Sequence, residues 1–154
     1  MKRLLLAPLF ISISLLSSGF LFKNANVKEL FCKGSTDLSL FVNKKTGQLY
    51  IYKINKLFED KPSNILIPFN GRYETRNYLL KGSSGINNGL FRAELTREYF
   101  GYPDKQQNVF YEVNFNDMTG KQRTYSYYAK PPGEVTFYRK CVFNNLDKGL
   151  KIQN

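Results

Sequence analysis

Apolar and polar residues alternate over many short stretches of the chain beyond residue 26. In residues 38–43 the even positions are Leu, Leu and Val, and in residues 109–115 the odd positions are Val, Tyr, Val and Phe. A period of two is typical of a strand with one buried face. Similar short apolar stretches lie at residues 27–33, 48–54, 65–69, 72–81, 90–99, 122–129 and 134–143. We therefore expect an all-β fold, a small antiparallel barrel or sandwich of eight or nine strands, in one domain over residues 27–143.

Glycine, proline and asparagine mark the connections between these strands. Residues 43–47 and 116–120 each begin with Asn and end in Thr-Gly, which predicts two hairpins, each closed by a left-handed glycine. Pro68 predicts a strand end, because proline has no N–H to donate to a sheet. Residues 82–89 contain three glycines and predict a flexible loop, and residues 144–154 predict a loose polar tail.

The first 22 residues have the layout of an export signal. Two cations precede an uncharged, mostly apolar run, and the core of that run ends in Ser-Ser-Gly at residues 17–19. A signal peptide of residues 1–19, cleaved after Gly19, fits this pattern. The apolar run continues to residue 22, so an uncleaved membrane anchor over residues 4–22 is the alternative. In both cases we expect the domain to be exported, to the periplasm or the cell exterior.

The chain is strongly basic, with 23 Lys and Arg against 12 Asp and Glu and a net charge of +11. Removal of Lys2 and Arg3 with the signal leaves 21 cations against the same 12 anions, a net charge of +9. Outside the cytoplasm, a basic surface favours an anionic envelope polymer, acidic lipid headgroups or an acidic protein surface as the partner. Because we expect the protein to be exported, we do not expect nucleic acid to be a binding partner. The alternative is that the scattered charges only keep the protein soluble and bind no specific partner.

The chain contains no histidine. This absence excludes the Ser-His-Asp and Cys-His catalytic machineries, which use imidazole to carry a proton near neutral pH. It also excludes the commonest zinc sites, and we expect no metal or other cofactor. Tryptophan is absent too, so the 13 Phe and 11 Tyr supply the aromatic packing.

Two cysteines, Cys32 and Cys141, lie near opposite ends of the expected domain. In an oxidising compartment an isolated pair of this kind predicts a structural disulfide. Closing a loop of this length stabilises a fold by roughly 4 kcal/mol in the chain-entropy model. The bridge would tie the first strand to the last.

Cations and aromatic residues are interleaved in the C-terminal third of the chain. Such mixtures stack sugars or bases, while a tyrosine-rich barrel wall is the alternative interpretation. The binding residues that this pattern predicts are Tyr125, Tyr127, Lys130, Tyr138, Arg139 and Lys140.

Glu94 and Glu98 are the best carboxylate pair for catalysis. Four residues along a strand separate them by about 13 Å, which is wider than the roughly 6.5–9.5 Å that an inverting glycosidase needs. Solvated ion pairs explain them better, and we expect no catalytic residues.

The presequence, the far-spaced cysteine pair and the two Asn-x-x-Thr-Gly hairpins together resemble the uncharacterised short exported β-rich proteins of marine cyanobacteria. The resemblance covers the layout of most of the chain and implies no activity. Residues 31–34, Phe-Cys-Lys-Gly, open a β-meander that is also similar to the small periplasmic barrel inhibitors of lysozyme. The inhibitor loop is matched only by Ser84-Gly85, and a basic surface suits a cationic lysozyme badly.

These observations predict an exported, non-catalytic binding or structural protein of the cell envelope, with an anionic glycan or lipid as its ligand. A protein-binding inhibitor or accessory subunit is the alternative, and a glycan hydrolase is a remote one.

Overall fold

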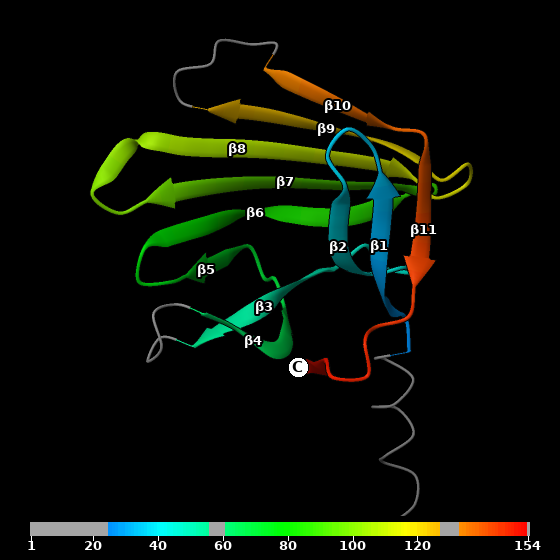
Figure 1. The fold of residues 1–154 in the computed structure, drawn as a ribbon, viewed down its shortest axis with the longest axis horizontal. Helices are drawn as coiled ribbons and strands as arrows, with labels where there is room; N and C mark the ends of the chain where they lie inside the picture. Colours follow the sequence, from blue (N-terminus) through cyan, green and yellow to red (C-terminus); the bar gives the residue numbers. More distant parts are fainter. Residues whose placement is uncertain (1–24, 56–60, 127–132, 154) are drawn as a thin grey trace, which may run out of the picture.

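The structure is a computed structural model that describes residues 25–55, 61–126 and 133–153. Within these ranges the chain forms twelve strands in two six-stranded sheets (Figure 1). The strands of the first sheet are, in spatial order, β11 (Lys140–Asn144), β1 (Val27–Lys33), β2 (Leu38–Asn43), β3 (Leu49–Asn55), β4 (Lys61–Pro68) and β12 (Lys151–Ile152). Those of the second sheet are β10 (Glu134–Tyr138), β9 (Thr119–Ser126), β8 (Tyr102–Asn114), β7 (Leu90–Tyr99), β6 (Tyr78–Asn87) and β5 (Arg72–Glu74).

The two sheets are curled and packed in a sandwich-like arrangement, which confirms the expected all-β class. Strands β1, β2 and β11 cross the second sheet near one of its ends, and β6, β7 and β8 extend beyond them (Figure 1). The chain passes from the second sheet to the first at Arg139, where β10 bends into β11. Each sheet keeps two edge strands, so the two sheets do not join into one closed barrel.

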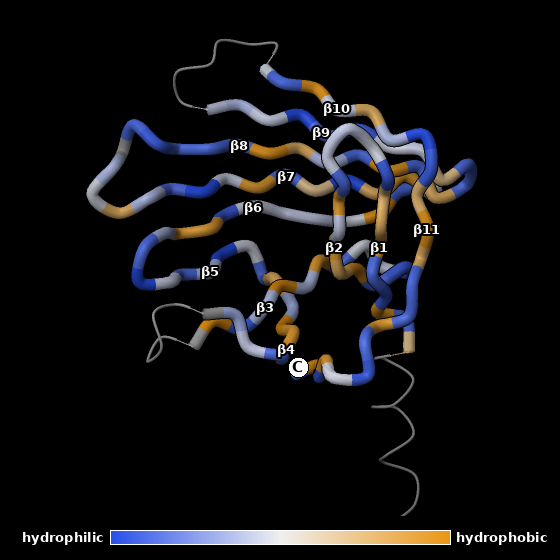
Figure 2. Tube along the Cα trace, viewed as in Figure 1, coloured by the Kyte–Doolittle hydropathy of each residue, from blue (hydrophilic) through white to orange (hydrophobic). Residues whose placement is uncertain are grey.

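The main core lies where the first sheet crosses the second, and Figure 2 shows apolar residues concentrated there. From β7, Phe91 and Ala93 point into this core, while the residues between and beside them point away. Val113 does the same from β8, opposite Phe91. The period of two in the sequence therefore divides the second sheet into an inner face, toward the first sheet, and an outer face.

The glycine-rich stretch at residues 82–89 is not a flexible loop, because β6 runs through it as far as Asn87. Its backbone pairs with β7 over the whole length of that strand. Gly82 has a φ of +150° and lies so close to the Glu94 carbonyl that a side chain there would collide with it. The connection is confined to Asn88 and Gly89, whose φ angles are 49° and 75°. The glycines allow close strand contact instead of disorder.

The first predicted hairpin is confirmed, and the second is shifted by two residues. Gly47 has a φ of 71°, and its N–H donates a 2.8 Å hydrogen bond to the carbonyl of Asn43. In the second hairpin the left-handed residue is Met118, with a φ of 55°, while Gly120 lies inside β9. The reason is Asn114, whose side-chain oxygen accepts from the Asn116 N–H at 2.9 Å and so begins the turn earlier.

The C-terminal segment is packed instead of loose. Lys151 and Ile152 form β12, which pairs in parallel with Ile65 and Leu66 of β4. Three apolar side chains from this segment also pack on the smaller core around Leu66, namely Leu146, Leu150 and Ile152. Their spacing among polar residues has no strand period, which is why the sequence pattern predicted a tail.

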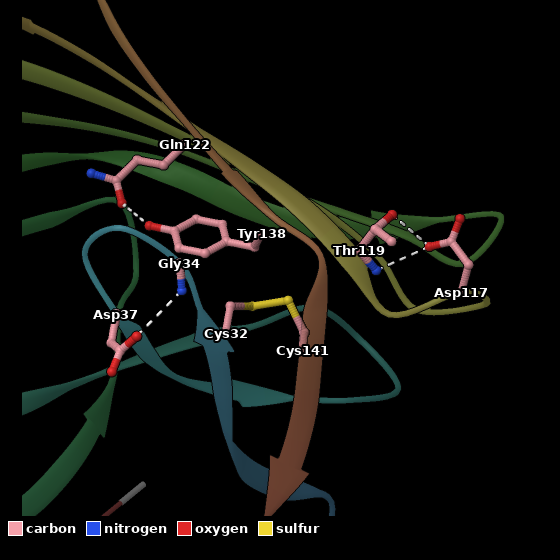
Figure 3. Close-up of a disulfide and its surroundings, with 8 residues drawn as sticks. All are labelled: Cys32, Gly34, Asp37, Asp117, Thr119, Gln122, Tyr138 and Cys141. Carbon is pink, nitrogen blue, oxygen red and sulfur yellow. Dashed lines mark hydrogen bonds between the residues drawn. A yellow bond between two sulfur atoms is a disulfide. The ribbon is translucent and has the colours of Figure 1, made fainter.

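The predicted disulfide is present between Cys32 and Cys141 (Figure 3). The two residues lie directly opposite each other in the antiparallel pair of β1 and β11, and both are buried. The bridge therefore joins the first strand to the eleventh, next to the bend that links the two sheets. A disulfide of this kind is typical of proteins in oxidising compartments.

Candidate binding groove

The outer face of the second sheet carries a shallow groove of about 680 Å³ that crosses β6, β7, β8 and β9. We call it the outer groove. The hollow forms over β6 because two small residues, Ser83 and Gly85, occupy its outer-face positions. A Cβ atom on Gly85 would meet no other atom within 4 Å, so the space above it is open. Larger side chains from the three neighbouring strands form the remaining walls of the groove.

Three charged side chains on adjacent strands form a row along one wall. Glu112 on β8 lies opposite Arg92 on β7 and Lys121 on β9. Its carboxylate accepts from Arg92 Nε at 2.9 Å and forms an ion pair with Lys121 Nζ at 2.7 Å. Hydrogen bonds from Lys121 and then Arg92 hold the pKa of Glu112 below its ordinary value. Glu112 therefore stays ionised and holds both cations in place along the groove.

Aromatic rings and a free cation form the other part of the groove. The rings of Phe110 and Tyr125 meet edge to face, with their centroids 5.6 Å apart. Arg123 lies directly opposite Phe110 in the strand pairing and is exposed. Among the residues that the structure describes, the Arg123 side chain forms no ion pair or hydrogen bond. Its guanidinium is therefore available to an anionic ligand beside two aromatic rings.

A second hollow, of about 460 Å³, continues the outer groove toward β10. The two hollows share Leu90, Glu112 and Lys121. The second adds Phe137, whose side chain is 71% exposed, and the cation Arg139. The pair of hollows thus forms one continuous surface across five strands, β6 to β10, that carries both aromatic rings and cations.

The structure brings three of the predicted binding residues to this surface. Tyr125 lines the outer groove, and Tyr138 and Arg139 line its continuation. Lys140 is exposed at the start of β11 and lines neither hollow. Tyr127 and Lys130 lie outside the described residues, as does the segment predicted to be a signal or anchor.

Tyr138 borders the second hollow, but its side chain is buried in the core. Only 2% of it is exposed, and its hydroxyl donates a 2.9 Å hydrogen bond to Oε1 of Gln122 (Figure 3). Burial, and then the nearby charge of Asp37, raise the pKa of the Tyr138 phenol. Because successive residues of β10 point to opposite faces, the ring on the outer face belongs to Phe137 instead.

Sequence reasoning missed Phe110, Glu112 and Lys121 as groove residues. The alternation in residues 109–115 places the even positions on the opposite face from the apolar odd ones, so Phe110 and Glu112 could be assigned to one surface. The partners of that surface depend on two pairing registers. The register with β9 is set by the shifted second hairpin, and the register with β7 is set by the turn at Phe100 and Gly101.

The two glutamates considered for catalysis have separate surroundings. Glu98 forms a 2.9 Å ion pair with Lys81 of β6, as the ion-pair interpretation predicted for it. Glu94 lines the outer groove and lies opposite Ser83 and Phe110 in the strand pairing. Within the described ranges, no group of three or more Cys, Asp or Glu side chains is placed to hold a metal ion.

Among residues 25–55, 61–126 and 133–153, no helix has the length and apolar character needed to cross a membrane. No protein-family model, no curated protein and no solved structure matches the chain.

Proposed function

We propose that the protein is exported and binds an anionic glycan of the cell envelope, without catalysing a reaction, through the outer groove and its continuation. The observation that carries this proposal is the free guanidinium of Arg123 beside the Phe110–Tyr125 ring pair, in an open groove that spans several strands. Aromatic rings with one polar edge bind amphipathic ligands such as sugars, and a guanidinium binds carboxylate or sulfate groups in bidentate fashion.

The shape of the surface supports a polymer instead of a small molecule. Small ligands are usually enclosed in deep, mostly apolar pockets. Here both hollows are shallow and join end to end through Leu90, Glu112 and Lys121. A linear chain of sugars can lie along such a groove and contact cations at several points, which lets weak contacts act together.

The outer groove can be filled without disturbing the core, which provides a sharp test. Gly85→Val places a side chain in the open space above β6, and valine suits a strand. We expect this variant, and separately Arg123→Gln, to reduce retention on immobilised alginate, a polymer of uronic acids. Retention of the parent protein should fall as salt rises, because the contacts are ionic.

Lys151→Gln is the matched control for Arg123→Gln. It removes one exposed cation from β12, in the other sheet and far from the groove (Figure 1). Equal losses for the two variants would mean that the basic charge acts nonspecifically, and retention that does not respond to salt would contradict the proposal. Neutral dextran serves as the polymer control.

A protein-binding role is the second candidate, and one observation favours it. Phe137 is 71% exposed on β10, which is an edge strand of the second sheet. Exposed apolar residues on an edge strand are common contacts for an added strand of a partner. Such binding would persist in high salt, would be lost in Phe137→Ser and would be kept in Arg123→Gln.

The hydrolase alternative is tested through Glu94, the carboxylate that lies in the outer groove. Hydrolysis of alginate that disappears in Glu94→Gln would support it. Complete absence of reducing-sugar release by the parent protein would favour binding alone.

A further inference from the structure

The turn between β7 and β8 presents aromatic side chains at one extremity of the molecule. Tyr99 and Tyr102 are paired at the ends of the two strands, and Phe100 and Gly101 form the connection. We call these four residues the aromatic tip. Phe100 is 45% exposed and Tyr102 is 56% exposed, which makes them two of the five large apolar residues exposed among the described residues. The tip lies at the end of the second sheet that extends beyond β1, β2 and β11 (Figure 1).

Three contacts tie the aromatic tip to neighbouring parts of the second sheet. The N–H of Phe100 donates a 2.9 Å hydrogen bond to the carbonyl of Asn77, in the neighbouring turn between β5 and β6. The guanidinium of Arg97 lies 4.9 Å from the ring centre of Tyr78 and donates to the Tyr99 hydroxyl at 3.2 Å. Because these contacts already fix the backbone of the tip, little conformational entropy is lost when its exposed rings bind elsewhere.

Cations surround the exposed rings. Lys105 Nζ lies 4.3 Å from the ring centre of Tyr102, and Arg97 packs beneath Tyr99. Arg76, in the neighbouring turn, is exposed as well. Asp104 follows the tip in sequence, while Glu98 and Glu74 form ion pairs with Lys81 and Arg72. Apart from those two ion pairs, the charged side chains around the tip are the three cations and the carboxylate of Asp104, so cations are in excess.

We propose that the aromatic tip docks the protein on lipid bilayers that contain anionic phospholipid. Aromatic side chains with a polar edge are concentrated at the headgroup level of membranes, and cations beside them are attracted to acidic headgroups. A specific protein interface buries at least about 1,200 Å². The two exposed rings of a four-residue turn offer far less surface, whereas insertion into a bilayer needs only the rings themselves.

This surface is separate from the outer groove. The groove residues Arg123 and Phe137 lie on β9 and β10, and none of the four tip residues lines either hollow. Glycan binding and membrane docking therefore depend on different residues. Variants of one site serve as controls for the other.

The absence of tryptophan from the chain allows a site-specific measurement. Phe100→Trp and Phe137→Trp each introduce a single fluorescent reporter at an exposed aromatic position. We expect vesicles of equal parts phosphatidylglycerol and phosphatidylcholine to shift the emission of the Phe100→Trp protein to shorter wavelength, because the indole enters the interface. Brominated acyl chains should quench it, and the Phe137→Trp reporter should respond to neither.

Loss of the rings tests the energetics. The full-length chain is used for every protein, so any contribution of residues 1–24 is common to all of them. We expect Phe100→Ser combined with Tyr102→Ser to weaken binding to the same vesicles at least about tenfold, since each ring loses its apolar burial. Lys105→Gln should weaken it by about fivefold, and Arg123→Gln should leave it unchanged.

Several outcomes would overturn the proposal. Vesicle binding by the Phe100→Trp protein without a shift of its emission would show that another part of the chain makes the contact. Equal binding by the double Ser variant, equal binding to pure phosphatidylcholine, or no binding at all would do so as well. Unfolding temperatures of the variants, expected to match the parent because both rings are exposed, exclude misfolding as the cause of a loss.

Discussion

The hydroxyl of Tyr138 donates a hydrogen bond to Oε1 of Gln122, which joins the end of β10 to β9 on the inner face of the second sheet. The Tyr138 ring covers Gly34, where an added Cβ would approach the ring carbons to 2.8 Å. Gly34 follows directly after β1, two residues beyond Cys32, so this contact lies beside the disulfide (Figure 3). Tyr138 and the bend into β11 connect the two sheets, while the bridge ties β11 to β1 within the first sheet.

Replacement of Tyr138 should therefore change stability and leave ligand binding intact. Tyr138→Phe keeps the ring and removes one hydrogen bond, and we expect a loss of about 0.5–1.5 kcal/mol in the free energy of unfolding. Tyr138→Ala leaves a cavity and should cost about 3–5 kcal/mol. Urea unfolding measures both. Alginate retention that falls in Tyr138→Phe, with its fold unchanged, would show that the ring contacts the ligand after all.

The disulfide should be the largest single contribution to stability. It closes a loop over a sequence separation of 109 residues, for which the chain-entropy model gives about 4–5 kcal/mol. We expect Cys32→Ala combined with Cys141→Ala to lower the free energy of unfolding by this amount. Val142→Ala, on the same strand but 37% exposed, is the control and should cost less than about 1 kcal/mol. Matching urea midpoints for the parent and the double variant would refute the prediction.

Glu112 should make stability depend on pH in the acid range. Its pKa is lower in the folded protein than the ordinary value of 4.5, so the carboxylate form stabilises the fold. That contribution is present above the ordinary pKa and is lost as the pH falls through the folded pKa. At neutral pH we expect Glu112→Gln to be less stable by up to about 1 kcal/mol, because Glu112 and its partners are partly exposed.

The difference between Glu112→Gln and the parent should shrink as the pH is lowered, and also when salt is added at neutral pH. Thermal unfolding over a pH series measures this. A difference of constant size at every pH would indicate a packing effect of the substitution instead.

Two glycines of β6 should respond in opposite ways to the same substitution. Gly82→Ala places a methyl group against the carbonyl of Glu94 at a φ that disfavours side chains, and we expect a loss of roughly 1–3 kcal/mol. Gly85→Ala meets open space and should stabilise the strand by up to about 1 kcal/mol. Urea midpoints of the two variants provide the comparison. Similar losses for both would mean that the close approach of β7 at Gly82 is unimportant.

The period of two in the sequence was sufficient to predict most of the strands, including β2, β7 and β8, because one buried face imposes alternation. It was insufficient for β6 and β12. In β6 the glycines allow the backbone of β7 to approach at Gly82, and glycines have no side chains to show the alternation. In β12 only two residues pair, and their partners Ile65 and Leu66 lie more than eighty positions earlier in the chain.

The candidate groove shows the same division. Tyr125 and Arg139 could be selected as binding residues because cations and aromatic residues are interleaved in that part of the sequence. Tyr138 met the same criterion but lies in the core, since its neighbour Phe137 occupies the outer face. Composition cannot distinguish the two faces of a strand when both carry aromatic residues.

By itself, the sequence determined the all-β class, the cysteine pair and the basic charge, because each follows from residue types and local spacing. Only the tertiary structure decided the split into two sheets, the role of Tyr138 and the row of Arg92, Glu112 and Lys121. The physical reason is that these features depend on strand register, and register depends on turn geometry. In the second hairpin, the side chain of Asn114 begins the turn two residues before the Asn that the pattern indicated.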